Sequence, residues 1–201
     1  MFRLPNSRKS EFSENEFSEE ERRFLLDLAH RSISNALEGR PLSVHLEPEW
    51  KTAKAGHLSG KRGAFCTLYL DGHLRGCVGY VFPVTSLLQT VAETARGAAF
   101  DDPRFPAVTP SEGPHLKISL SILSVLTPIA PEEVEVGRHG LLVSRDGKRG
   151  VLLPQVPVEQ GWDRKTFLEQ TCLKAGLPQD AWKTGATMES FTAEIFGDDG
   201  T

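Results

Sequence analysis

Three segments of the chain repeat apolar residues every three or four positions, which predicts amphipathic helices. The first has a strong start, because Ser18 and Glu21 have the spacing of a capping box, and Gly39 follows its end. The third begins after Asp163, a good N-cap residue, and stops at Gly176. The predicted helices cover residues 18–38, about 85–100 and about 164–175.

Other segments alternate apolar and polar residues, as half-buried strands do. Two of them contain an Asp-Gly pair between strand-like halves, which predicts β-hairpins. Because the strands pair locally and no crossover helix separates them, we expect an α+β fold with a mainly antiparallel sheet, built from hairpins and flanked by helices. The predicted hairpins cover 63–79 and 140–155, and the further strands cover 115–123 and 188–196.

The turn at Asp71-Gly72 fixes the register of the first hairpin. A two-residue loop would place Cys66 opposite Cys77, at a spacing that disfavours a disulfide, so free thiols are expected. A three-residue loop would instead place Thr67 opposite Arg75. We favour the two-residue loop, because it gathers four apolar residues on one face: Phe65, Tyr69, Leu74 and Val78.

The domain boundaries follow from composition. Residues 1–17 are polar and start without periodicity, which predicts a flexible N-terminal tail, although Phe17 could staple the first helix. Residues 41–60 predict an extended crossing segment. We expect residues 18–201 to form a single domain, divided into two tightly joined subdomains.

Composition excludes several classes of protein. The 201 residues carry a net charge of −4, so nucleic acid is a disfavoured partner. No run of 18 apolar residues predicts a membrane span, and three sparse cysteines are typical of a reducing, cytoplasmic compartment. The cysteines lack CxxC spacing and the six histidines are scattered, so no metal site is predicted.

The densest unusual segment is LRGCVG, residues 74–79. On a strand, Arg75 and Cys77 would share one face, and a nearby guanidinium favours the reactive thiolate. Gly76 and Gly79 would let a ligand or another backbone approach closely. The alternative is structural: Cys77 is a small buried residue and the glycines mark a bulge.

Three other positions are candidates for a site. Asp101 and Asp102 follow the end of a helix, where negative charge opposes the helix dipole, so they could fix Arg104 or face a cleft. The alternative is ordinary turn chemistry before a proline. His139 precedes a strand and could titrate near neutrality, and Gln155 follows the second hairpin; either could orient a ligand or be structural.

The chain resembles a known family at LRGCVG: the AMME chromosomal region candidate protein family, or AMMECR domain, whose hallmark is LRGC[IV]G. The segments GAFCTLYLDG, AFDDPRFPAVTP and EVGRHGLLV also match, so the resemblance covers about residues 18–196. It implies a larger and a smaller subdomain with the hallmark near their junction. It also implies an intracellular protein similar to partners of Memo-like and radical SAM proteins (the AmmeMemoRadiSam system), with no settled activity and no known cofactor.

Two functional hypotheses remain, with a scaffold role as a third. In the first, the protein binds an unknown small molecule or peptide, or acts as an adaptor, through Arg75, Gly76, Gly79, Arg104 and Gln155 around a cleft. In the second, it is an enzyme with Cys77 as thiol, Arg75 as its electrostatic partner and His139 as base. We favour the first, because no nucleophile–base pair is evident from spacing, and we expect Arg75, Cys77, Arg104, His139 and Gln155 to converge on one cleft.

Overall fold

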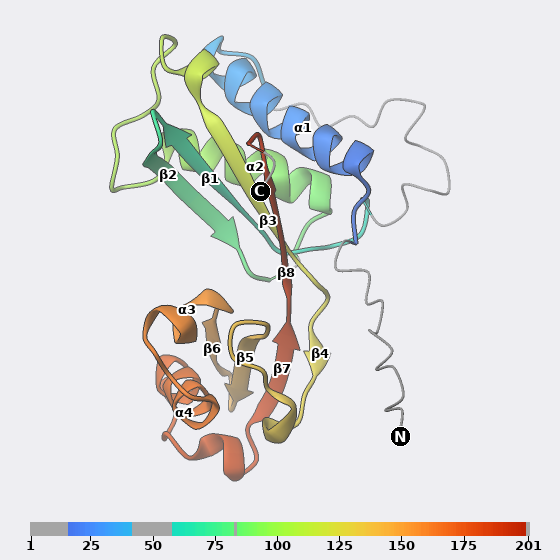
Figure 1. Ribbon diagram of the computed structural model, residues 1–201, viewed down its shortest axis with the longest axis vertical. Helices are drawn as coiled ribbons and strands as arrows, with labels where there is room; N and C mark the ends of the chain where they lie inside the picture. Colours follow the sequence, from blue (N-terminus) through green and yellow to red (C-terminus); the bar gives the residue numbers. More distant parts are fainter. Residues whose placement is uncertain (1–15, 42–57, 83, 200–201) are drawn as a thin grey trace, which may run out of the picture.

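The chain forms two four-stranded antiparallel sheets, each with its own helices (Figure 1). The computed structural model describes residues 16–41, 58–82 and 84–199. The larger subdomain holds the sheet β2-β1-β3-β8, and the smaller holds β4-β7-β5-β6. The α+β class, the antiparallel pairing and the two subdomains are thus confirmed. The division into two sheets was not predicted, and most of the expected 41–60 segment lies outside the described residues.

The larger subdomain packs both of its helices on one face of its sheet (Figure 1). The capping box at Ser18 and Glu21 starts α1 as predicted, and Ser86 caps α2. α2 contacts β1 and β2 directly, while α1 packs on α2. Its elements are α1 (Glu19–Leu37), β1 (Ala64–Leu70), β2 (His73–Tyr80), α2 (Leu87–Phe100), β3 (Lys117–Leu123) and β8 (Ala193–Gly197).

The smaller subdomain packs one helix, α4, against the second hairpin. The side chain of Asp163 accepts a hydrogen bond from the N–H of Thr166 and caps that helix, as predicted. Phe167 and Leu168 of α4 are buried in a second apolar core. Its elements are β4 (Thr127–Pro128), β5 (Gly140–Arg145), β6 (Lys148–Leu152), α3 (Gln155–Glu159), α4 (Arg164–Lys174) and β7 (Thr187–Phe191).

The chain crosses between the subdomains twice, at adjacent points. The N–H of Ser124 donates to the carbonyl of Thr192, and the N–H of Thr192 donates to the Ser124 hydroxyl, each over 2.9 Å. The single strand predicted over 188–196 is therefore wrong. It divides at Thr192 into β7 and β8, which belong to different sheets, because the chain passes from one subdomain to the other there.

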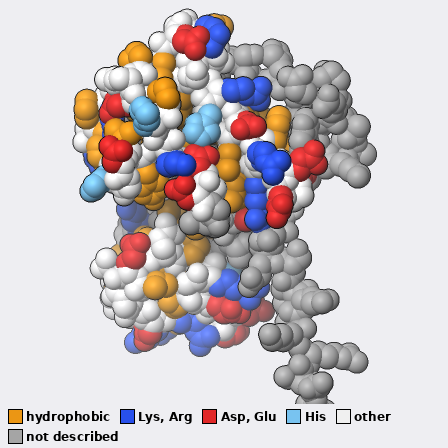
Figure 2. Space-filling view, turned by 45° about the horizontal axis from the view of Figure 1, so that its top comes forward, with side chains coloured by type: hydrophobic (Ala, Val, Ile, Leu, Met, Phe, Trp, Pro, Cys, Tyr) orange, Lys and Arg blue, Asp and Glu red, His pale blue; other side chains and the backbone are white. Residues whose placement is uncertain are grey.

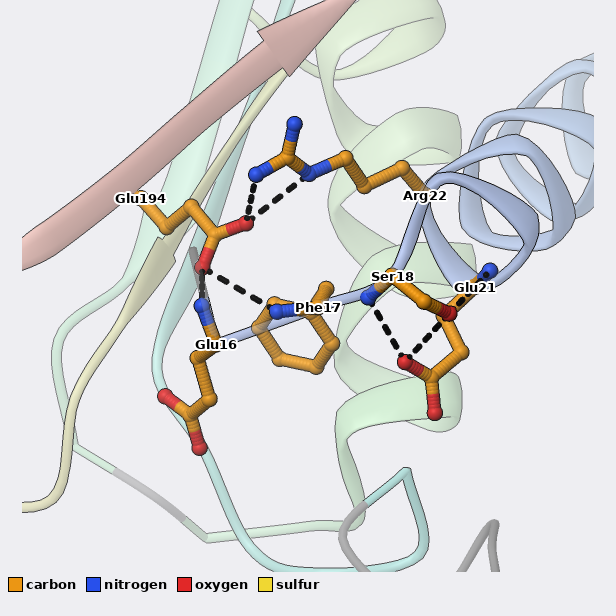
Figure 3. A network of polar contacts seen from close by, with 6 residues as sticks. All are labelled: Glu16, Phe17, Ser18, Glu21, Arg22 and Glu194. Atoms are coloured by element: carbon orange, nitrogen blue, oxygen red, sulfur yellow. Dashed lines mark hydrogen bonds and ion pairs between the residues drawn. The ribbon is translucent and has the colours of Figure 1, made fainter. Parts of the chain in front are cut away.

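The segment before α1 is held by β8 (Figure 3). Glu194 accepts hydrogen bonds from the backbone N–H groups of Glu16 and Phe17 and from the guanidinium of Arg22. Phe17 is only 2% exposed and belongs to the larger core. These two residues, which we assigned to the tail, are therefore fixed parts of the fold, while residues 1–15 lie outside the described part of the chain.

The first hairpin has the predicted turn but a different register. Asp71 and Gly72 both have positive φ, as a type I′ turn requires, and Leu70 pairs with His73. A bulge then follows, so Thr67, and not Cys66, lies opposite Cys77. The expected apolar face is also wrong. The core side of β1 carries Ala64, Cys66 and Leu68, whereas Phe65 and Tyr69 lie on the other side.

Gly76 allows α2 to pack closely on β2. A Cβ atom at this position would lie 2.0 Å from the carbonyl oxygen of Ala98, which is rigid helix backbone. We predict that Gly76→Ala lowers the free energy of unfolding by about 1–3 kcal/mol, because helix and strand must separate. Chemical denaturation measures this, with Cys77→Ala on the same strand as control. Equal stability of Gly76→Ala and the wild type would contradict the close packing.

Candidate functional site

A buried arginine attaches a neighbouring segment to β2, an edge strand of the larger sheet. Arg75 is the extra residue of the bulge in β2, since Leu68 pairs with Gly76 and Tyr69 with Leu74. Its guanidinium binds both carboxylate oxygens of Glu112, at 2.9 and 3.1 Å. It also donates to the carbonyl oxygens of residues 106 and 107. Arg75 thus fastens the segment after α2 to the edge strand, and its donors are occupied by protein groups.

Asp102 and Arg104 continue this closure along the strand. The Asp102 carboxylate accepts a hydrogen bond from the Cys77 N–H at 2.8 Å and two from the Arg104 guanidinium, at 2.7 and 3.0 Å. Arg104 donates in turn to the Cys77 carbonyl. Asp102 therefore fixes Arg104, which was one of the roles predicted for it. The edge of β2 carries paired backbone groups at this point instead of exposed ones.

These contacts favour the charged form of both carboxylates. The hydrogen bonds from Arg75, with those from Thr109, lower the pKa of Glu112 to about 2, from an ordinary value of 4.5. The Arg104 guanidinium, followed by the Cys77 N–H, holds the pKa of Asp102 well below its ordinary value. Both groups are ionised at neutral pH, and the segment they hold is stabilised by charge-assisted hydrogen bonds.

The cysteines differ sharply in access. All three are free thiols, as predicted, and Cys66 and Cys172 are completely buried. Burial raises the pKa of both of these thiols. Cys77 is half-buried on the face of the sheet opposite α2, where its sulfur accepts a hydrogen bond from the Thr67 hydroxyl at 3.3 Å. It is the most accessible thiol, but Arg75 is engaged elsewhere.

The five predicted site residues do not form one cluster of contacts. Hydrogen bonds bring Cys77 and Arg104 together, with Arg75 beside them on β2. His139 and Gln155 belong to the smaller subdomain. The His139 ring accepts from the Glu135 N–H, and burial, together with the Arg138 cation, lowers its pKa. Gln155 is the exposed first residue of α3.

The two glycines of the motif are occupied by the protein itself. Gly76 lies against α2, as described above, and a Cβ atom at Gly79 would overlap the Phe65 ring. The N–H that follows Gly76 is already bound to Asp102. The structural alternative for LRGCVG, a bulge with close packing at glycine, therefore explains most of this segment.

A cavity lies at the junction of the subdomains, where β2 ends. It has a volume of about 640 Å³, within the range of small-molecule sites. The larger subdomain contributes residues 79–82, 84–85, Thr90 and Glu93, and the smaller contributes 149–151 and Lys174. Sequence reasoning identified only Gly79 among these. The lining comes from segments joined by tertiary packing, and the local signal, the apolar run 80–84, is indistinguishable from a strand end.

The visible surface carries charges of both signs (Figure 2). Figure 2 shows basic and acidic side chains interspersed over the visible face, without a field of one sign. Within residues 16–41, 58–82 and 84–199, no group of three or more His, Cys, Asp or Glu residues could hold a metal ion. No helix in these ranges is long and apolar enough to cross a bilayer.

The fold and these sites define the class: a two-subdomain α+β protein with an arginine-closed sheet edge and a pocket at the junction. The sequence pattern of the AMMECR1 family matches residues 26–196. A protein of Methanopyrus kandleri is 40% identical over 188 residues, covering 88% of each chain, and one of Nanoarchaeum equitans is 39% identical, covering 87% of this chain and 99% of that one. The chain belongs to the AMMECR1 family.

A solved structure supports the same fold. The crystal structure of an uncharacterised protein from Pyrococcus horikoshii is 40% identical, with a TM-score of 0.65. The alignment covers 88% of this chain and 91% of that one. The relationship therefore extends over both subdomains.

Protonation of Glu112 in acid should weaken its contacts with Arg75 and lower the stability of the protein. Because the folded pKa of Glu112 is below its ordinary value, its contribution to stability is present above about pH 4.5 and is lost as the pH falls towards about 2. We predict that Glu112→Gln lowers the free energy of unfolding at pH 7 by about 1–3 kcal/mol and flattens its decline between these pH values. Urea denaturation across this range measures both effects. The exposed Glu159→Gln is the control, and equal acid slopes for the wild type and Glu112→Gln would contradict the assignment.

Proposed function

We propose that this protein is a ligand-binding module that takes a small organic molecule in the pocket between its subdomains. The observation that carries the proposal is the 640 Å³ junction pocket, lined from both subdomains. Ligand sites occur preferentially at such junctions, with apolar walls and a few polar groups that set orientation. Here the apolar wall comes from Val81, Phe82, Val84 and Val151, and the polar groups include Glu93 and Lys174.

The contacts of the hallmark segment support binding over catalysis at Cys77. A thiol becomes a good nucleophile when a cation or a base stabilises its thiolate. Arg75 is neutralised by Glu112, and the His139 ring is bound within the smaller subdomain. The enzyme alternative therefore lacks the neighbours that it assigned to Cys77. The hallmark instead positions β2, whose last residues, Gly79 and Tyr80, line the pocket.

The resemblance stated above extends the proposal to partners. We propose that the ligand-bound protein acts as an accessory to Memo-like or radical SAM proteins. Calorimetry with a purified Memo-like protein, with and without a ligand that fills the pocket, tests this. Binding that depends on the ligand supports it, and absence of binding in both states rejects it.

Blocking the pocket tests the binding function. We predict that Val151→Trp abolishes most ligand signals found for the wild type in a ligand-observed NMR screen of a fragment library, because the indole occupies the space between the subdomains. Ile195→Trp is the matched control, since Ile195 is exposed on β8 and lies outside the pocket. Fragment binding that survives Val151→Trp at wild-type strength would reject the pocket as the site.

Thiol chemistry tests the enzyme alternative. We predict that one thiol of the native protein reacts with an aromatic disulfide reagent, at the rate of an ordinary exposed cysteine or slower, and that Cys77→Ser removes this reaction. Cys66 and Cys172 should react only after denaturation, because they are buried. A reaction of Cys77 roughly a hundredfold faster than that of a model thiol at neutral pH would favour the enzyme.

A further inference from the structure

Two cations line the junction pocket from elements that pack directly on each other. A Cβ atom at Gly150 would lie 2.3 Å from the backbone nitrogen of Ala175, so β6 packs directly on the end of α4. The preceding residue of each pair, Arg149 on β6 and Lys174 in the last turn of α4, lines the pocket. Both positive side chains therefore line the same cavity, from two elements that are in direct contact.

Neither cation has an acidic partner within the described part of the chain. Other arginines are paired there, for example Arg22 with Glu194 and Arg104 with Asp102. Arg149 and Lys174 form no such ion pair with a described residue. Both cations line one cavity, where the acidic group of a ligand would neutralise positive charge.

The carboxylate that lines the pocket, that of Glu93, is hydrogen-bonded within its own helix. Glu93 of α2 accepts a hydrogen bond from the Gln89 side-chain amide at 2.6 Å, one turn earlier. It is part of the lining but does not neutralise either cation through a contact of 4 Å or less. Glu93 therefore does not neutralise Arg149 or Lys174, and a ligand could do so.

The neighbouring wall is apolar and partly aromatic. Phe82 and Val84, from the connection between β2 and α2, are 36% and 72% exposed, which is high for large apolar side chains. The Arg149 guanidinium lies over the Phe82 ring, 5.7 Å from its centre. The cationic end and the apolar wall therefore meet at this contact, which joins the two subdomains.

We propose that the pocket takes a small amphipathic organic anion. Its apolar, ring-bearing body lies against Phe82 and Val84, and its acidic group, a carboxylate or a phosphate, lies between Arg149 and Lys174. A volume of about 640 Å³ accommodates a ligand of one to three rings. The inference rests on the proposed binding function and adds the charge and shape of the ligand.

A matched pair of fluorescent probes tests the charge preference. The anionic probe is 8-anilinonaphthalene-1-sulfonate, and the neutral probe, N-phenyl-1-naphthylamine, has the same ring body. We expect Arg149→Gln combined with Lys174→Gln to weaken binding of the anionic probe by roughly 10-fold, because charge-assisted hydrogen bonds are lost. Binding of the neutral probe should change by less than about twofold, and Phe82→Ala should weaken both probes.

The controls separate this inference from the proposed function. Lys165→Gln, on the same helix as Lys174, removes one positive charge outside the pocket, as each single substitution of the double variant does within it, and should leave both probes unaffected. Displacement of the anionic probe by 1-naphthoate or 1-naphthyl phosphate, but not by 1-naphthalenemethanol, supports the inference, and the stronger competitor identifies the acidic group. Arg149 and Lys174 are exposed, so unchanged thermal midpoints should show that the variants fold.

Two results would overturn the proposal at different levels. If Val151→Trp removes both probes while the charge variants change neither, the pocket binds ligands without a preference for anions, and only the present inference fails. If both probes bind equally well to Val151→Trp, or the wild type binds neither, the proposed binding function fails as well.

Discussion

The larger subdomain depends on one buried guanidinium. Arg75 stands at the bulge of an edge strand and satisfies Glu112 and two backbone carbonyl oxygens at once. Asp102 and Arg104 add a second attachment of the segment after α2, at the backbone of Cys77, so that the edge of β2 is paired at both points. A charged residue at 9% exposure is tolerated there because each of its three guanidinium nitrogens donates to an acceptor. The hallmark residues therefore serve first to pair the edge of β2. The pocket lies at the end of this strand.

The features that the sequence predicted correctly are those with local causes. Capping residues such as Ser18 and Asp163 fix helix starts through bonds three residues away. The Asp-Gly turns need only two residues with positive φ. The bulge at Arg75 has no such local cause, because it is stabilised by Glu112, 37 residues later. The break at Thr192 is hidden for the same reason: the alternation of apolar and polar residues continues through it, while its pairing partner, Ser124, is distant in sequence.

The candidate site was harder to predict than the fold. Cys77 and Arg104 are in contact, and Arg75 lies on the same strand as Cys77, but the contacts of all three residues pair the edge of the sheet. His139 and Gln155 were included because they lay in segments matching the family, which says nothing about where their side chains meet. The junction pocket is lined by residues from both subdomains, including Gly150, whose packing against Ala175 is a contact between a strand and a helix that no spacing rule encodes.

In the sequence, the smaller subdomain is inserted between segments of the larger one. This arrangement also determines the order in which the two subdomains can fold during synthesis. Residues 127–191 carry every strand of the smaller sheet, whereas the larger sheet waits for β8, which follows them. On the ribosome, the smaller subdomain can therefore fold while its host is still a three-stranded sheet with β3 as an open edge. The contacts between the start of α1 and β8 also form late, because Glu194, which binds Phe17 and Arg22, is synthesised only then. Within the described residues, α1 is thus secured by the strand that follows all the others, β8.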